Sequence, residues 1–372
     1  MSIFTKQQNP PVEQIMNDHP ENILTANNIS IGYRKGLKNP CIVHQNLSFH
    51  LSTGELTCLI GPNGAGKSTL LRSLAAAQPL IDGVICLYNK PLSSYSKRTL
   101  SSQIGLVLTD RSYAGALKVK ELVALGRYPY TGFFGHLSND DLKKVEWAMN
   151  ETGIFDKHDQ YVAELSDGER QKAMIAKALC QESSIIILDE PTSFLDISSR
   201  IEIMSLLRNL AVEHNKAILL STHDLEQALI SADKLWMLSN TDGMICGTPE
   251  DLVLNGKINN LFKHKDIFFD LHSGNFRQSR NNLQPILVES DDEIFYWVSN
   301  FLNRYGYYAV HSFIDPEKAF HHQSSDCDYQ KTILSLKIQT TECILITNVN
   351  KITKVNSFEA LSDYLKKRPN TI

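Results

Sequence analysis

The fold of this chain is decided by nine consecutive residues, Gly61-Pro62-Asn63-Gly64-Ala65-Gly66-Lys67-Ser68-Thr69, which fit the pattern G-x-x-x-x-G-K-[ST]. The apolar run Leu56 to Ile60 precedes them, and apolar residues at helical spacing, Leu70, Leu71 and Leu74, follow. A strand that passes through a glycine-rich turn into a helix is the setting in which this pattern binds phosphate. We therefore predict a P-loop in an α/β fold.

The residue types of this stretch predict what each would do. Glycines allow backbone N–H groups to turn inward around phosphate oxygens, and the helix that follows presents its positive end to them. Lys67 would neutralise the β- and γ-phosphate oxygens, and Ser68 would be a ligand of Mg²⁺. A glycine turn without a ligand is the alternative, and the motifs below make it the weaker one.

A second apolar run, Ile185 to Leu188, ends in two adjacent carboxylates, Asp189 and Glu190. The run is too short for a helix and is best explained as a buried central strand. At the carboxyl end of such a strand, Asp189 can hold the Mg²⁺ shell while Glu190 accepts a proton from the attacking water. The alternative is a strand that ends in a solvated turn before Pro191, and beside a P-loop we consider it the weaker explanation.

A third apolar run, Ala217 to Ser221, leads to His223. If this run is a parallel strand of the same sheet, His223 lies at the same catalytic edge, where its imidazole can contact the γ-phosphate and orient the water. A histidine at a strand end is more often simply exposed. The role predicted for His223 therefore depends on the neighbouring motifs.

Residues Leu165-Ser166-Asp167-Gly168-Glu169 open a helical segment that continues from Arg170 to Gln181. Ser166 and Glu169 fit the capping box S-x-x-E, which predicts a helix amino terminus. Such an end, with a serine hydroxyl and free N–H groups near Gly168, is a second candidate anion site. One nucleotide needs only one phosphate-binding loop. The alternative is therefore that Ser166 caps the helix and binds no anion.

Composition excludes several other classes of protein. The chain has 372 residues and a formal net charge of −4, so it carries no excess of basic residues for nucleic acid. Its seven cysteines occur singly, without a CxxC pair for zinc or a disulfide framework. The amino terminus does not resemble a signal peptide, and no run approaches the ~20 apolar residues that span a bilayer. If the protein works at a membrane, a partner must supply the membrane part.

The pattern of strands and helices suggests three parts. Residues 1–22 are polar and proline-containing and are predicted to be a tail, residues 23–274 the nucleotide-binding domain, and residues 275–372 an accessory α/β domain whose role the sequence does not assign. Within the second part, short strands fill the opening stretch, and residues from about 91 to 164 are predicted to form a largely helical insert. The boundary is placed near Asn275, where the sequence is polar.

The accessory domain has its own pattern of apolar residues. Ile286 to Val288 and Tyr307 to Val310 are predicted strands, and Leu334, Leu336 and Ile338 alternate as in a third. A helix between the first two strands is expected to turn these residues to the core: Ile294, Trp297, Val298, Phe301 and Leu302. Ser357 can cap a final helix.

With these motifs in this order, the chain resembles the ATP-binding subunits of ABC transporters. GPNGAGKST resembles their Walker A motif, LSDGE the signature, IIILDE Walker B and STHD the histidine switch. The resemblance covers roughly residues 23–274. It implies an ABC-type nucleotide-binding domain with a P-loop parallel-sheet core, an antiparallel β layer and a helical insert, and it implies ATP and Mg²⁺ as cofactors.

The same resemblance implies a homodimer, in which the signature of one copy closes over the ATP held by the P-loop of the other. Ser193 to Asp196 resembles the D-loop, so Asp196 is expected at the dimer seam. Tyr33 resembles the aromatic residue that stacks on adenine, although a half-buried strand tyrosine is about equally good as an explanation.

A narrower likeness lies in Glu121 to Tyr130, which is similar to the segment after the Q-loop in importers of iron-siderophores, haem and cobalamin. It implies that the insert receives transmembrane permease subunits at the cytoplasmic side of the inner (plasma) membrane, and that a substrate-binding protein delivers the chelate. The sequence departs from the family at Thr109, which stands where the Q-loop glutamine is expected and is followed by Asp110. It also has Asp167 and Glu169 where Gly and Gln are commonest.

We therefore predict an ATPase that energises import of an iron-siderophore, haem or cobalamin. One alternative is a non-transport ABC ATPase. Such proteins usually carry two ATP-binding domains in one chain or a long inserted coiled coil, and this sequence shows neither. The other is a nucleotide-gated regulatory module that works through the carboxy-terminal domain, and the intact pair Asp189 and Glu190 argues against it.

Overall fold

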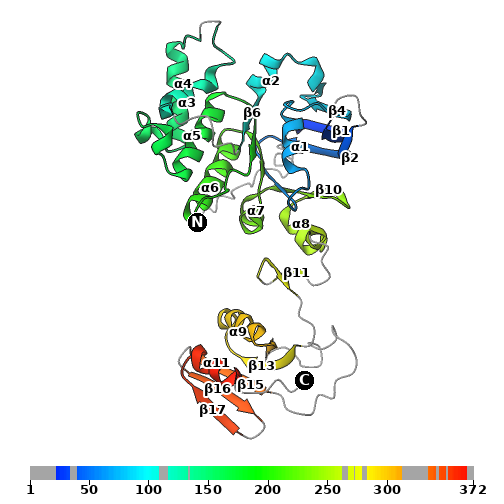
Figure 1. Cartoon of the computed structure of the whole chain (residues 1–372), viewed down its shortest axis with the longest axis vertical. Helices are drawn as coiled ribbons and strands as arrows, with labels where there is room; N and C mark the ends of the chain where they lie inside the picture. Colours follow the sequence, from blue (N-terminus) through cyan, green and yellow to red (C-terminus); the bar gives the residue numbers. More distant parts are fainter. Residues whose placement is uncertain are drawn as a thin grey trace, which may run out of the picture. The chain divides into compact units, whose positions relative to one another are not determined.

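The computed structural model describes residues 22–33, 40–108, 116–132, 135–261, 267–271, 273–278, 283–311, 334–340, 343–348 and 351–366. The chain divides into two compact units, Met1–Lys263 and His264–Ile372, whose elements are labelled in Figure 1. The boundary predicted near Asn275 falls inside the second unit. Within the described residues, no helix is both long and apolar enough to span a bilayer.

The first unit is built on a six-stranded sheet with the strand order β10-β9-β3-β8-β7-β6. Five of these strands are parallel, and β10 runs antiparallel to β9. Every residue of β3, β7 and β8 is buried. Burial on both faces explains why these strands are continuous apolar runs rather than alternating ones. The bounds are β3 (Leu56–Ile60), β6 (Ile104–Val107), β7 (Ile185–Asp189), β8 (Ala217–Ser221), β9 (Lys234–Ser239) and β10 (Gly243–Gly247).

An antiparallel sheet, ordered β2-β1-β4-β5, forms a second layer, as the family resemblance implies. Its strands are β1 (Asn22–Tyr33), β2 (Cys41–Ser52), β4 (Asp82–Leu87) and β5 (Lys90–Pro91). One apolar core joins this sheet to α1 (Lys67–Leu74) and to the six-stranded sheet, and in it the ring of Phe49 lies 4.5 Å from that of Trp236. Asn46 takes a positive φ of 58°, and β2 continues through it.

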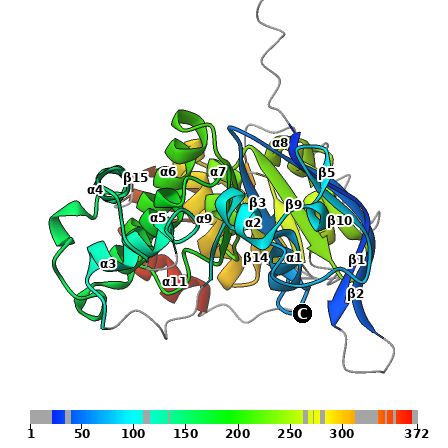
Figure 2. The same ribbon diagram turned by 90° about the horizontal axis from the view of Figure 1, so that it is seen from above.

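Helices surround the six-stranded sheet. They are α2 (Lys97–Gln103), α3 (Val119–Ala124), α4 (Asn139–Glu151), α5 (Asp167–Cys180), α6 (Ile197–Glu213), α7 (Leu225–Ser231) and α8 (Pro249–Leu254), with short 3₁₀ turns at η2 (Leu92–Ser94), η3 (Leu125–Arg127), η4 (Phe155–Lys157), η5 (Val162–Glu164) and η6 (Lys257–Leu261). Figures 1 and 2 show α3, α4 and α5 together, on the side of this unit away from β1 and β2.

The helical insert predicted over about residues 91–164 is interrupted by a strand. Residues 104–107 form β6, which pairs in parallel with β7 and completes the edge of the six-stranded sheet. Gly105 permits this close approach, because a Cβ atom at that position would lie 2.8 Å from the hydroxyl oxygen of Ser183. Helices of the predicted range lie on both sides of this strand, with α2 before it and α3 and α4 after it.

The second unit contains a hairpin and a five-stranded sheet. The hairpin joins β11 (Ile267–Asp270) to β12 (Asn275–Gln278), and the sheet has the strand order β14-β13-β15-β16-β17. Its strands are β13 (Gln284–Glu289), β14 (Tyr307–His311), β15 (Leu334–Thr340), β16 (Cys343–Asn348) and β17 (Lys351–Val355). The predicted boundary at Asn275 would separate the two strands of the hairpin.

Two helices, α9 (Asp292–Arg304) and α11 (Phe358–Lys366), share one apolar core with this sheet. Val298, Phe301 and Leu302 of α9 are buried, as predicted, but Trp297 is 68% exposed. Trp297 lies at the margin of the helical stripe, where the pattern alone does not settle whether a side chain reaches the core. The hydroxyl of Ser357 accepts a hydrogen bond from the amide of Ala360, so the predicted cap of α11 is confirmed.

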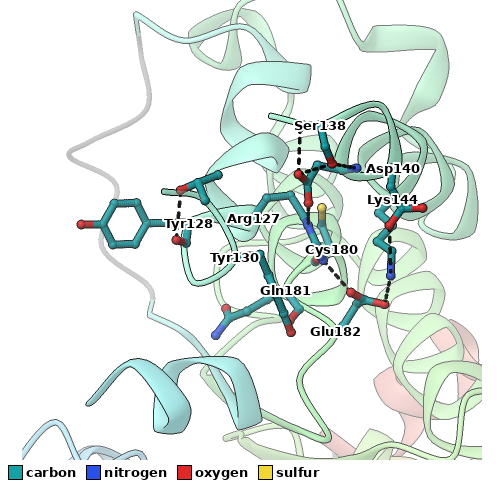
Figure 3. A network of polar contacts seen from close by, with 11 residues as sticks. Arg127, Tyr128, Tyr130, Ser138, Asp140, Lys144, Cys180, Gln181 and Glu182 are labelled. Carbon is teal, nitrogen blue, oxygen red and sulfur yellow. Dashed lines mark hydrogen bonds and ion pairs between the residues drawn. The ribbon is translucent and has the colours of Figure 1, made fainter. Parts of the chain in front are cut away.

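Arg127 fastens the helical part of the first unit to the end of α5 (Figure 3). Its side chain is only 4% exposed. The guanidinium donates to Asp141 of α4 at 2.8 Å, to the carbonyl of Cys180 at 2.8 Å and to Glu182 at 2.7 Å. Three acceptors therefore compensate the buried positive charge, which also lies 4.0 Å from the centre of the Tyr130 ring.

Both carboxylates around Arg127 are themselves held in place. The hydroxyl and the amide of Ser138 donate to Asp141, and together with Arg127 they lower the pKa of Asp141 to about 2. Lys144 donates to the other oxygen of Glu182. The network thus keeps two carboxylates ionised around one guanidinium, and removal of the guanidinium leaves negative charges facing each other.

Replacing Arg127 by alanine should lower the free energy of unfolding by about 3–5 kcal/mol, because it leaves buried Asp141 without its cation. Arg127→Lys should lower the free energy of unfolding by less than Arg127→Ala does. Lysine keeps the positive charge but lacks the planar guanidinium that reaches several acceptors at once. Urea unfolding curves would measure both. Lys120→Ala is the matched control, because it removes an exposed pair, Lys120 with Asp159 at 2.7 Å, and should leave the curve unchanged. Equal effects of Arg127→Ala and Lys120→Ala would contradict the structural role of Arg127.

Candidate active site

The predicted motifs meet because their strands are neighbours. The P-loop follows β3, Asp189 ends β7 and is followed by Glu190, and His223 follows β8. Strand β8 pairs in parallel with β3 on one side and with β7 on the other. The carboxyl ends of parallel strands lie at one edge of a sheet, which is where ligands bind in open α/β folds.

The P-loop is a compact turn that only glycine permits at several positions. Gly64 and Gly66 have positive φ angles of 77° and 85°, and Gly66 is the N-cap of α1. A Cβ atom at Gly61 would lie 2.3 Å from the carbonyl oxygen of Leu238. The carbonyl of Ala65 lies 2.7 Å from the imidazole Nε2 of His44, which holds the loop to β2.

The side chain of Lys67 lies back along this loop. Its Nζ donates to the carbonyls of Gly61 at 2.9 Å and Pro62 at 3.3 Å. Burial lowers the pKa of Lys67, and the carboxylates of Glu190 and Asp189 oppose that effect. The ammonium therefore lies between the loop that would receive phosphate and the two acids that would act on it.

The carboxylate of Glu190 is held by two side chains. Its Oε1 lies 2.6 Å from Nε2 of His223, and its Oε2 accepts a hydrogen bond of 2.9 Å from the hydroxyl of Ser193. The same Nε2 of His223 lies 3.5 Å from Nζ of Lys67. The structure thus brings the three predicted catalytic residues, Lys67, Glu190 and His223, into one cluster.

Asp189 and Ser68, the predicted Mg²⁺ ligands, are presented by different elements. Asp189 ends β7 and is buried, whereas Ser68 lies in the first turn of α1, just after Lys67. A carboxylate and a hydroxyl both supply oxygen, which Mg²⁺ prefers. This donor set fits the ion.

Two further predicted site residues have different outcomes. Tyr33, 44% exposed, places its hydroxyl 2.6 Å from that of Thr69 in the P-loop, so the ring lies beside the loop. Thr109 and the neighbouring Asp110 lie outside the described residues. The proposed adenine contact of Tyr33 and the proposed Q-loop position of Thr109 both stay predictions.

The signature forms the amino terminus of α5, and its capping box is present. The hydroxyl of Ser166 accepts from the amide of Glu169 at 3.3 Å, and the Glu169 carboxylate accepts from the amide of Ser166 at 2.9 Å. That second bond lowers the pKa of Glu169. Asp167 pairs with Arg170 at 2.7 Å, which accounts for a residue that departs from the family pattern.

Asp196 caps α6 by accepting a hydrogen bond of 2.7 Å from the amide of Ser199. A Cβ atom at Gly168 would lie 3.0 Å from the hydroxyl of the same Ser199. The signature and the D-loop therefore lie side by side, although they are far apart in the sequence. The sequence indicates a role for each motif, and the structure adds this contact between them.

Two serines escaped sequence analysis. Ser193 binds the Glu190 carboxylate, and Ser221 contacts both Asp189 and Glu190. Each was recognised only as part of a motif or of a strand. The pairing of Ser221 with Asp189 across β7 and β8 is a signal that an alignment of the two predicted strands could have supplied.

Known proteins match this chain over the same elements. Residues 44–193 fit the family model described as ABC transporter. An uncharacterized ABC transporter ATP-binding protein of Methanocaldococcus jannaschii is 38% identical over 265 residues, which are 70% of this chain and 89% of that protein. The ferric enterobactin transport ATP-binding protein FepC of Escherichia coli K12 is 36% identical over 247 residues, 66% of this chain and 89% of that protein.

The structure of cbiO1 from Clostridium perfringens, part of the ABC transporter complex cbiONQ, has a TM-score of 0.56 at 27% identity and covers 64% of this chain and 93% of its own. The residues that fit the family model include the P-loop, the signature and the acid pair. The chain belongs to the family of ABC transporter ATP-binding proteins.

Proposed function

We propose that this chain hydrolyses ATP to drive the import of an iron-siderophore chelate. It would act as a homodimer bound to transmembrane permease subunits at the cytoplasmic side of the inner membrane, with a substrate-binding protein delivering the cargo. The observation that carries the ATPase is the cluster of Glu190 and His223, 2.6 Å apart, beside Lys67 of the P-loop.

Each residue of the cluster has a role in this mechanism. Lys67 exchanges the carbonyls of Gly61 and Pro62 for phosphate oxygens and stabilises the charge that develops on them. Glu190 accepts a proton from the attacking water, and His223 orients the water and the γ-phosphate. Mg²⁺, held by Ser68 and Asp189, would supply further charge neutralisation when bound.

The proposed dimer gives the signature its purpose. Ser166 caps the amino terminus of α5, and a helix amino terminus suits an anion. In the proposed dimer this end closes over the ATP of the other copy, with Asp196 at the seam. Opening after hydrolysis would return the pair to the state that receives a new nucleotide.

The proposed cargo rests on relatives. FepC is named for ferric enterobactin transport, and the segment from Glu121 to Tyr130 is similar to that of importers of such chelates. Haem and cobalamin are the alternative cargoes of the same class of importer. A transport assay separates them.

Replacing Glu190 by glutamine should lower kcat for ATP hydrolysis by at least about 100-fold, because an amide cannot accept the proton. Binding of ATP should be kept, since glutamine has the size and most hydrogen bonds of glutamate. Phosphate release and nucleotide binding would be measured on the same preparation. The matched control is Glu202→Gln on the exposed side of α6, which should hydrolyse ATP like the wild type. Full turnover by Glu190→Gln would overturn the assignment of the base.

ATPase activity of the chain purified with its permease in lipid vesicles should rise several-fold when a binding protein loaded with a ferric siderophore is added. Binding protein loaded with haem or with cobalamin is the comparison, and the empty protein is the control. Stimulation by haem or cobalamin alone would replace the proposed cargo. Steady activity that ignores permease and cargo would favour a non-transport ATPase.

A further inference from the structure

We propose that Ser221 is a positioning residue that sets the geometry between the metal carboxylate Asp189 and the general base Glu190. The inference rests on the roles proposed above for these two acids. It assigns a function to a hydroxyl that acts through the two acids.

Ser221 is placed to reach both acids. It is the last residue of β8, is fully buried, and pairs with Asp189 in the neighbouring strand β7. Its hydroxyl donates to Oδ1 of Asp189 at 2.7 Å and accepts from the backbone amide of Glu190 at 2.9 Å. A hydroxyl has one donor and two acceptor sites, so it makes both bonds at once.

The backbone of Glu190 needs this support. Its φ angle of 50° lies in the left-handed region, which residues with a side chain rarely adopt and which persists when the surroundings hold it. Ser221 binds the amide of Glu190, and the amide of Ser193 donates to the Glu190 carbonyl at 3.1 Å. Both sides of the unusual residue are therefore fixed.

This local twist decides where the two carboxylates go. Asp189 ends the strand with its carboxylate bonded to Ser221, whereas the chain turns at Glu190 and its carboxylate bonds to Ser193 and His223. Without the hydroxyl of Ser221, the Asp189 carboxylate loses a donor and the Glu190 amide loses its acceptor in a buried place. Misplacement of catalytic groups by about 1 Å can cost on the order of 100-fold in rate.

Burial alone does not make a serine a positioning residue. Ser183 of the same chain offers a comparison with Ser221. Ser183 is also fully buried, just before the other end of β7, yet its hydroxyl has no hydrogen-bond partner among the described residues. Replacing Ser183 by alanine therefore removes a hydroxyl of equal burial that holds nothing. It is the matched control for the same change at Ser221.

The decisive pair is Ser221→Thr against Ser221→Val, because threonine and valine have nearly the same size and shape and differ by the hydroxyl. We expect Ser221→Thr to keep most of the wild-type kcat. Ser221→Val and Ser221→Ala should lower kcat about 10- to 100-fold and raise the Mg²⁺ concentration for half-maximal activity, while KM for ATP stays within about twofold. Ser183→Ala should match the wild type in all three quantities.

Thermal unfolding of the full chain would show that the Ser221→Thr and Ser221→Val variants are folded at the assay temperature. Equal kcat and equal Mg²⁺ dependence of these two variants would overturn the proposal, since the hydroxyl would then be irrelevant. The outcome is separate from that of Glu190→Gln. Retained turnover in Glu190→Gln removes the proposed base, whereas lost turnover there, together with equal behaviour of the two Ser221 variants, removes only the role of Ser221.

Discussion

The position of β8 between β3 and β7 is the constraint on which the first unit depends. All residues of these three strands are buried, and the ladder that joins them fixes the distances among the loops at their carboxyl ends. Hydrogen bonding and apolar packing therefore bring the P-loop, the acid pair and His223 together. The order of the strands therefore decides which side chains meet at this edge of the sheet.

Much of this arrangement can be predicted from the sequence, because each motif is contiguous with the strand or helix that presents it. The P-loop, the run before Asp189 and the capping box at Ser166 each carry their own local pattern. What the sequence hides is register. The contacts of Ser221 with the acid pair and of Gly168 with Ser199 depend on how separate segments align, which no single stretch reveals.

The predictions that the structure contradicts failed for physical reasons. Strand β6 has only four residues and directly follows α2, so a helical pattern around it concealed its pairing with β7. Trp297 shares the spacing of a core stripe but lies at its margin and is exposed. For β6, pairing with β7 overrides the local helical pattern.

The strand order also affects how the protein folds during its synthesis on the ribosome. Chains emerge from the amino terminus and fold as their parts become available. Strand β3 is made early, but both of its partners in the six-stranded sheet, β8 and β9, begin at Ala217 and Lys234. A nascent chain thus carries its P-loop long before the sheet that frames it exists. The frame of the P-loop is therefore completed late, after β8 enters the gap between β3 and β7 and β9 pairs with the other side of β3.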